Sequence, residues 1–226
     1  MGCTRLANYK LIAFDKIPST QTYAHDLIAN GRADDHVAIM ADVQTAGRGR
    51  YRRTWISNNG NLYVSFLYKC PERDSRISYA IAVAVAETLS GFGLTPSIKW
   101  PNDILIDSKK ICGILIEYSG RFMIVGIGIN IKSCPSISEY GTTCVNKYAP
   151  VTREELLGAL MKNLDKWMRA DFASVRARWM DMAIGINNVV RYRGGDAVMM
   201  GINENGALIL RCGAQYVMVY GDEIAM

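Results

Sequence analysis

The chain has 226 residues, of which 50% are hydrophobic and 21% are charged. This length fits one domain, or one domain with a small addition, and the composition excludes disorder as the main state. No apolar run reaches the roughly 18–20 residues that a membrane-spanning helix needs. The net charge of +5 is too small to indicate a dedicated nucleic-acid-binding protein. It fits a protein that handles small anions or meets an acidic partner.

The cysteines and the start of the chain indicate a reducing compartment. The first residues lack the apolar stretch of a secretory signal. The six cysteines include no Cys-x-x-Cys pair, and only two histidines could help them bind a metal, so we assign no metal site. Cysteines in apolar runs, such as Cys112 and Cys212, are expected to be free and buried. We therefore expect a cytoplasmic protein.

Strand and helix patterns alternate over the first part of the chain. Ser19 is a suitable N-cap for a helical run that ends at Gly31. A second helix has apolar residues at i, i+3, i+4 and i+7 from Ile77 onward and stops at Gly91. Residues 44–61 are polar and rich in Gly and Arg, which predicts a loop. The expected strands are 9–17, 36–43 and 62–68, and the expected helices are 20–30 and 77–89.

The second part begins with four short strands. Their close spacing favours antiparallel pairing, because a parallel crossover needs about a dozen residues. Thr152 and Glu155 form a capping box for a helix that runs to about Ala170. From Asn188 onward, short strands alternate with turn signals. The expected strands are 97–100, 104–106, 111–118 and 122–131, and a last helix is expected at 172–183.

These elements predict the α+β class with two domains. Residues 1–186 are expected to form a mixed, largely antiparallel sheet flanked by helices. Residues 187–226 are expected to form a small β-barrel or sandwich. Fewer than about ten residues precede the first expected strand, so we expect no further domain in front of it.

An arginine-rich loop is the first candidate for chemistry. Four arginines and no acidic residue stand between Gln44 and Ile56. Clustered guanidinium groups repel one another unless an anion relieves the repulsion or the loop stays solvated. Glycines allow close approach to a ligand, and arginine makes bidentate contacts with phosphate and carboxylate. The segment 47–53 therefore predicts a loop that grips anions and orders on binding, or else a solvated or nucleic-acid-binding basic loop.

Two lysines stand where strands are expected to begin or end. Lys99 ends one strand and Asp103 opens the next, although the residues between them could also form an ordinary turn. Lys110 opens an apolar strand, where a half-buried lysine is a fixed positive charge for a developing anion. Simple alternation places Lys110 on the face of Cys112, opposite Gly113.

Two glycines and a helix start complete the candidates. Gly126 and Gly128 occupy alternate positions of a strand, so both clear space on one face for a flat ligand or for a packed helix. Asn130 ends that strand with an amide. The segment 19–21 reads first as a helix cap, and the N-terminus of a helix is also rich in donors for a polar ligand.

Together and in this order, these motifs resemble those of the biotin protein ligases. The resemblance spans nearly the whole chain, and Lys-Trp-Pro-Asn-Asp followed by Lys-x-x-Gly-Ile-Leu is its most discriminating part. Because so little precedes the first strand, the chain resembles the monofunctional type, which lacks the N-terminal DNA-binding domain of some relatives. The matching segments are 19–21, 44–50 continuing to 55, 61–65, 99–104, 110–117, 126–130, 201–208 and 221–224.

The resemblance implies a two-step ligase with a class II synthetase-like catalytic domain and a C-terminal SH3-like β-barrel. ATP and biotin would first give biotinyl-5′-adenylate and pyrophosphate, with Mg²⁺ shielding the triphosphate. A lysine of a biotin carboxyl carrier domain, as in acetyl-CoA carboxylase and related carboxylases, would then attack the mixed anhydride. The resemblance implies no DNA and no membrane partner, and it allows a homodimer.

The resemblance also implies roles for individual residues. Lys110 and Arg50 would act in catalysis, with Lys110 between the biotin carboxylate and the α-phosphate. Biotin would contact Ser19, Thr20, Gln21, Gln44, Gly47, Arg48, Arg50, Lys110, Gly113, Gly126 and Gly128. The nucleotide would contact Arg48, Arg50, Arg53, Trp55, Lys99, Asn102 and Asn130. Arg52 departs from the family pattern, because it replaces the third glycine usual in the loop.

Two other functions remain open at this point. One is a lipoate or octanoate ligase of the same superfamily, against which the Gly-Arg-Gly-Arg loop and the Lys-Trp-Pro-Asn-Asp motif argue. The other is a nucleic-acid-binding protein that uses the arginine loop, against which the small net charge argues. Tyr140 is an aromatic candidate for stacking on adenine, and that role is left unassigned.

Overall fold

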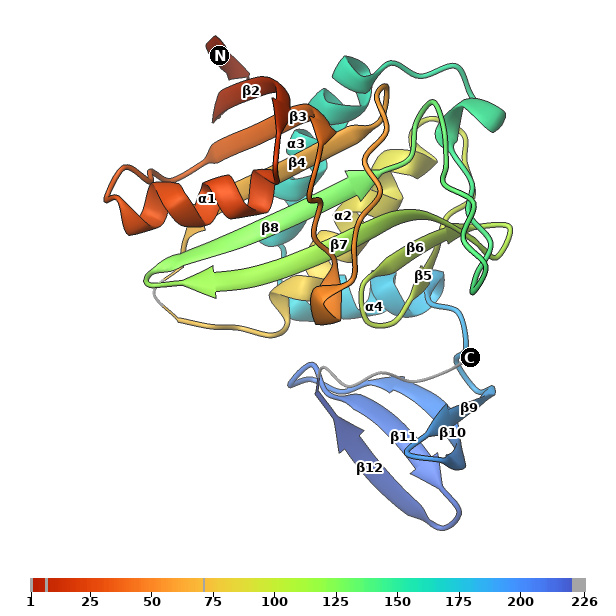
Figure 1. The fold of residues 1–226 in the computed structure, drawn as a ribbon. Coiled ribbons are helices and arrows are strands. Elements are labelled where there is room, and N and C mark those ends of the chain that lie inside the picture. The colour runs from red at the N-terminus through yellow and green to blue at the C-terminus, as the bar shows by residue number, and fades with distance from the viewer. Residues whose placement is uncertain (1, 7, 71, 221–226) are drawn as a thin grey trace.

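The computed structural model describes residues 2–6, 8–70 and 72–220 and contains two β-sheets. The larger sheet has eight strands in the order β1-β2-β3-β4-β8-β7-β6-β5 (Figure 1). β2 and β3 are parallel, and every other neighbouring pair is antiparallel. The predicted mixed, largely antiparallel sheet is confirmed. Its strands are β1 (Gly2–Leu6), β2 (Tyr9–Ile17), β3 (Val37–Gln44), β4 (Leu62–Lys69), β5 (Ser97–Lys99), β6 (Asp103–Ile106), β7 (Lys109–Ser119) and β8 (Phe122–Ile129).

The helices begin at the capping residues that the sequence predicts. Ser19 accepts a hydrogen bond from the Thr22 amide, and Thr152 and Glu155 form the expected capping box. Sequence analysis missed the strand β1 and two short 3₁₀ helices, because each is too short for a periodic pattern. The helices are α1 (Thr20–Ala29), η1 (Arg50–Arg52), α2 (Ile77–Ser90), η2 (Val145–Lys147), α3 (Arg153–Met168) and α4 (Phe172–Met182).

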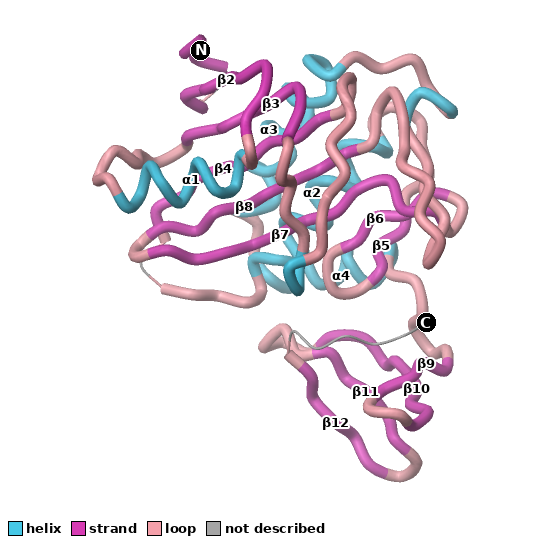
Figure 2. The backbone as a smooth tube through the Cα atoms, in the orientation of Figure 1, coloured by secondary structure: helices cyan, strands magenta, loops and turns pink. Residues whose placement is uncertain are grey.

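The two faces of the large sheet are covered by different helices. Side chains alternate between faces along each strand, so Ile39 packs with α1 while Ala38 and Met40 join the core on the other side. Figures 1 and 2 show α1 on one face and α2 and α3 on the other. α2 is buried on nearly all sides because it lies between the sheet and the helices α3 and α4. The face beside α1 is the less thickly covered one.

The C-terminal segment forms a separate, open antiparallel sheet. Its strands are β9 (Val189–Tyr192), β10 (Gly195–Ile202), β11 (Leu208–Cys212) and β12 (Gln215–Val219), in the order β12-β11-β10-β9. The prediction of a small barrel is wrong for the described residues, because β9 and β12 lie at opposite edges and do not pair. Alternate residues such as Leu208 and Leu210 join the main core. The sheet therefore covers its apolar face by packing on the first domain instead of closing on itself.

Tyr79 joins the two parts of the molecule. Its hydroxyl donates to the backbone oxygen of Gly206 at 2.8 Å and accepts a hydrogen bond from Trp100 Nε1 at 3.2 Å. Nearby, Gly201 has a φ of +121°, and a Cβ there would lie 2.5 Å from Met180 Cε. Close packing and one buried hydroxyl thus hold the small sheet against α2 and α4.

No helix in the described part of the chain is both long enough and apolar enough to cross a bilayer.

We predict that Tyr79→Phe lowers the unfolding free energy by about 1–3 kcal/mol, because it leaves two buried polar groups without their partner. Urea unfolding followed by circular dichroism measures the change. Tyr216→Phe is the control, since Tyr216 is 63% exposed and its loss should cost less than about 0.5 kcal/mol. Equal unfolding midpoints for the two variants would contradict the role of Tyr79.

Candidate functional site

A cavity of about 610 Å³ lies on the α1 side of the large sheet. Its wall is formed by the start of α1, the arginine loop, the turn before β6, and strands β4, β7 and β8. Segments far apart in the sequence therefore meet in one place. The predicted site residues that line it are Ser19, Thr20, Gln21, Gln44, Arg48, Arg50, Arg53, Trp55, Lys99, Asn102, Lys110, Gly113, Gly126 and Gly128.

Two predicted site residues lie outside this wall. A Cβ on Gly47 would come within 2.4 Å of the Trp55 backbone oxygen, so this glycine serves the close packing of the loop on itself. Asn130 is 2% exposed, and its Nδ2 donates to the Thr143 backbone oxygen at 3.1 Å. Asn130 therefore supports the segment behind the cavity. Its role on the nucleotide side was implied by the family resemblance.

A buried polar network forms one end of the cavity. Gln44 Oε1 accepts from the Thr20 amide at 2.9 Å, and the Thr20 and Ser65 hydroxyls lie 2.8 Å apart. Ser65 Oγ in turn donates to Gln21 Oε1 at 2.9 Å. These neutral donors and acceptors lie at the start of α1, where free backbone N–H groups also point toward a ligand. The end of the cavity suits an uncharged, polar ring.

Trp55 covers the glycines of the sheet. Gly113 on β7 and Gly128 on β8 are directly paired, which leaves a flat patch without side chains. A Cβ on Gly128 would lie 2.5 Å from the Trp55 indole, and one on Gly113 would lie 2.7 Å from it. At the third glycine, Gly126, the side chain of Gln21 takes the space at 2.7 Å. The Trp55 indole therefore lies on the glycine patch and forms part of the cavity wall.

Lys110 faces the cavity, although simple alternation predicted otherwise. A β-bulge opposite Ile104 and Leu105 inserts one extra residue into β7, so Lys110 shares the face of Gly113 and not that of Cys112. The predicted face was wrong for that reason. Lys110 Nζ lies 2.7 Å from Asp103 Oδ1, with the lysine side chain only 17% exposed. A half-buried cation is thus held at a defined point of the wall.

The arginine loop lies against the sheet at two points. Arg48 Nη2 donates to Glu117 Oε1 on β7 at 2.6 Å, and Arg50 Nη1 donates to Asn102 Oδ1 at 2.9 Å. The Gly49 amide donates to the Arg53 backbone oxygen at 2.8 Å, which holds the two sides of the loop together. Arg48 and Arg50 are therefore directed toward the cavity and its rim by specific partners.

Comparison with known proteins identifies the family. Residues 13–132, more than half of the chain, match the model of the biotin/lipoate A/B protein ligase family. This chain belongs to that family. The resemblance predicted from the motifs is confirmed, and the site described above lies mostly within the matched residues.

Relatives and solved structures support this membership. The bifunctional ligase/repressor BirA of Bacillus subtilis is 30% identical over 249 residues, which cover 99% of this chain and 76% of that protein. A biotin–[acetyl-CoA-carboxylase] ligase of Mycobacterium tuberculosis is 28% identical, covering 93% of this chain and 87% of that protein. The biotin protein ligase of Aquifex aeolicus, solved in complex with biotin and ATP, is 27% identical with a TM-score of 0.82, covering 95% and 97% of the two chains.

Sequence analysis missed several residues of this family member's cavity. Ser65 lies in a strand of buried apolar residues, and its polarity there was a usable signal. The ring centroid of Tyr140 lies 5.5 Å from Lys110 Nζ. The sequence made Tyr140 a candidate for stacking on adenine, but that role was left unassigned. Arg191 and Gly194 reach the cavity from the C-terminal sheet, and no local pattern indicates that.

We predict that Gly128→Ala displaces the Trp55 indole, because the new Cβ would meet it at 2.5 Å. The other three tryptophans are buried, so a red shift of tryptophan emission and stronger acrylamide quenching report on Trp55. Gly158→Ala is the control, since nothing lies within 4 Å of a Cβ at that helical position. An unchanged spectrum for Gly128→Ala would contradict the packing of Trp55.

Proposed function

We propose that this chain is an ATP-dependent biotin protein ligase that forms biotinyl-5′-AMP and transfers biotin to a lysine of a biotin carboxyl carrier domain. The observation that carries the proposal is the convergence of Lys110 and the arginine loop on one cavity beside the start of α1. Its volume of about 610 Å³ lies within the range of small-ligand pockets.

The two ends of the cavity suit the two ends of biotin. The neutral network of Thr20, Gln44 and Ser65 offers donors and acceptors to the ureido ring. The apolar middle, with Trp55 over the paired glycines, suits the fused ring and the aliphatic chain. The biotin carboxylate then points toward Lys110, where a positive charge is held.

Lys110 and the arginines would act on the charge that develops during adenylate formation. A carboxylate oxygen of biotin attacks the α-phosphorus of ATP. The bond between the α-phosphorus and the oxygen that bridges to the β-phosphate breaks, and pyrophosphate leaves with the electron pair of that bond. Lys110 Nζ, fixed by Asp103, stabilises the phosphoryl oxygens in the transition state. Arg48 and Arg50 would bind the carboxylate and phosphates, with Arg53, Lys99 and Asn102 on the nucleotide side.

The second step would release AMP. The amine of the acceptor lysine attacks the anhydride carbonyl, the C–O bond to AMP breaks, and the amine loses its proton. Water would compete for the same carbonyl, so a loop that covers the adenylate protects it.

We predict that residues 45–56 are mobile without ligand, because they are rich in glycine and like charge. Full protection of these amides from hydrogen exchange in the free protein would contradict this.

Magnesium ions fit the site as companions of ATP. The described residues hold no group of three or more His, Cys, Asp or Glu side chains that could bind a metal by themselves. Mg²⁺ commonly binds through substrate phosphates together with one or two carboxylates, and Asp103 offers a carboxylate beside Lys110. The ion would neutralise triphosphate charge when bound.

Substrate choice tests the proposal directly. The protein is supplied with ATP and biotin, lipoate or octanoate, pyrophosphate release is followed, and transfer to an added carrier domain is detected by mass. We expect release and transfer with biotin. Release with lipoate or octanoate but not with biotin would make the chain a lipoate or octanoate ligase. Salt-sensitive RNA or DNA binding without any adenylate would favour the nucleic-acid alternative.

We predict that Lys110→Ala slows adenylate formation by about 10²–10³-fold while the fold is kept, because its charge acts mainly in the transition state. Biotin-dependent pyrophosphate release measures the rate, and circular dichroism checks the fold. Lys109→Ala is the matched control, because Lys109 is the exposed neighbour and should leave the rate unchanged. Equal rates for Lys110→Ala and the unmodified protein would refute its role.

A further inference from the structure

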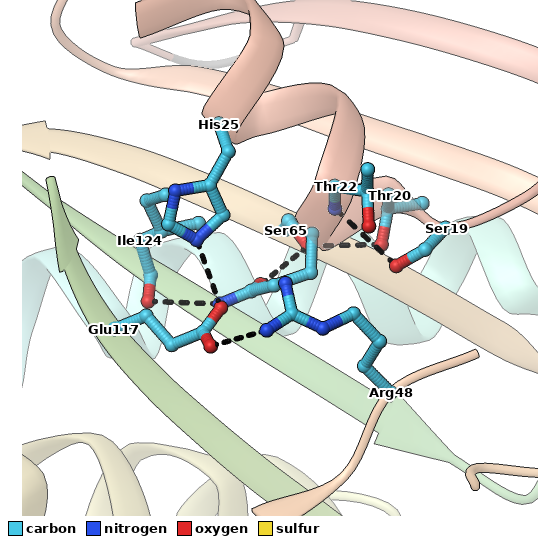
Figure 3. A network of polar contacts seen from close by, with 9 residues as sticks. Ser19, Thr20, Thr22, His25, Arg48, Ser65, Glu117 and Ile124 are labelled. Carbon is cyan, nitrogen blue, oxygen red and sulfur yellow. Dashed lines mark hydrogen bonds and ion pairs between the residues drawn. The ribbon is translucent and has the colours of Figure 1, made fainter. Parts of the chain in front are cut away.

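Three side chains from three elements meet at the edge of the cavity, where the arginine loop lies on β7. His25 of α1, Glu117 of β7 and Arg48 of the loop point toward one another (Figure 3). His25 Nε2 lies 3.0 Å from Glu117 Oε2, and Arg48 Nη2 lies 2.6 Å from Glu117 Oε1. Each oxygen of one carboxylate thus has its own partner. A carboxylate only accepts hydrogen bonds, so the histidine nitrogen is the donor.

The surroundings keep Glu117 ionised and in place. Burial of the carboxyl raises its pKa, but the hydrogen bonds from His25 and Gln21 and the charge of Arg48 outweigh burial and lower the pKa. His25 and Gln21 both belong to α1, whose start also holds the polar end of the cavity. Glu117 is therefore anchored to α1.

Arg48 belongs to the part that lacks regular structure. The loop is held at its base by the hydrogen bond from the Trp55 amide to the Gly47 oxygen at 2.9 Å. A long side chain on such a loop loses considerable rotamer freedom when it is held in one direction. Arg48 lines both the main cavity and a second one of about 490 Å³ beside the loop, whereas Glu117 lines only the second. Glu117 therefore binds Arg48 from outside the main cavity.

We propose that Glu117, fixed by His25, is a positioning residue that holds Arg48 at the rim of the cavity. The pair also docks the first part of the loop onto β7. One guanidinium donates to Glu117 through Nη2 and still presents the N–H groups of Nε and Nη1 to an anion. That the oriented Arg48 binds an anion rests on the proposed function, in which the anion is the biotin carboxylate or the phosphate of the adenylate.

The chain offers a closely matched control. Glu87 Oε1 pairs with Arg178 Nη2 at 2.5 Å, and the glutamate side chains of the two pairs are 22% and 25% exposed. The Glu87–Arg178 pair joins α2 to α4 and lies away from the cavity wall. Glu87→Gln therefore removes a similar charge and a similar ion pair without touching the loop.

The first measurement is the exchange of the loop amides in the free protein. We expect Glu117→Gln to speed hydrogen exchange of residues 45–56 by about tenfold relative to the unmodified protein, and Glu87→Gln to leave it unchanged. This readout does not depend on any enzymatic activity. Exchange that is equal in Glu117→Gln and in Glu87→Gln would overturn the docking role.

The second measurement is a double-mutant cycle on biotin binding with ATP present. We expect Glu117→Gln to raise the KM and Kd for biotin about five- to tenfold with a smaller change in kcat, and to add nothing once Arg48→Ala is present. Additive effects of the two substitutions, or tighter biotin binding by Glu117→Gln, would overturn the proposal. If the unmodified protein neither binds nor activates biotin, the proposed function fails, and the exchange measurement alone decides about Glu117.

Discussion

The site depends on a patch of sheet that carries no side chains. Gly113 and Gly128 are paired across β7 and β8, and Gly126 is paired with Ser65 of β4. Because strand side chains alternate in direction, glycines at these positions clear one face while the other face remains filled by the core. Trp55 and Gln21 lie in the cleared space and form the wall of the cavity. Any larger residue there would push them out.

Charge is arranged around this patch in pairs. Lys110 is held by Asp103 and Arg48 by Glu117, while Arg50 is directed by the neutral Asn102. A cation with a partner is partly oriented before the anion arrives, which lowers the entropy lost on binding. This pairing also moderates the repulsion among four neighbouring arginines. The local concentration of positive charge is therefore compatible with a net charge of only +5.

The small C-terminal sheet also contributes to the cavity. It buries its apolar face on the helices of the first domain, and the Tyr79 hydroxyl ties it to Gly206. Arg191 and Gly194 then reach the cavity. In the described residues this sheet is open on both edges, so contact with its neighbour stabilises it and closure does not. Its place against the first domain gives the cavity part of its border.

The sequence by itself determined most of the elements and the family. Caps at Ser19 and Thr152, the periodicity of the helix from Ile77, and the order of the motifs sufficed for the fold class, because these signals are local. Most of the site residues that the motifs indicated do line the cavity. The tertiary structure alone decided which way Lys110 points, since a single bulged residue reverses a face and leaves no mark in the pattern. It also decided that Asn130 supports the cavity from behind, that Arg48 meets Glu117, and that the last sheet stays open. Those outcomes depend on which segments meet in space, and such long-range contacts are invisible to spacing along the chain.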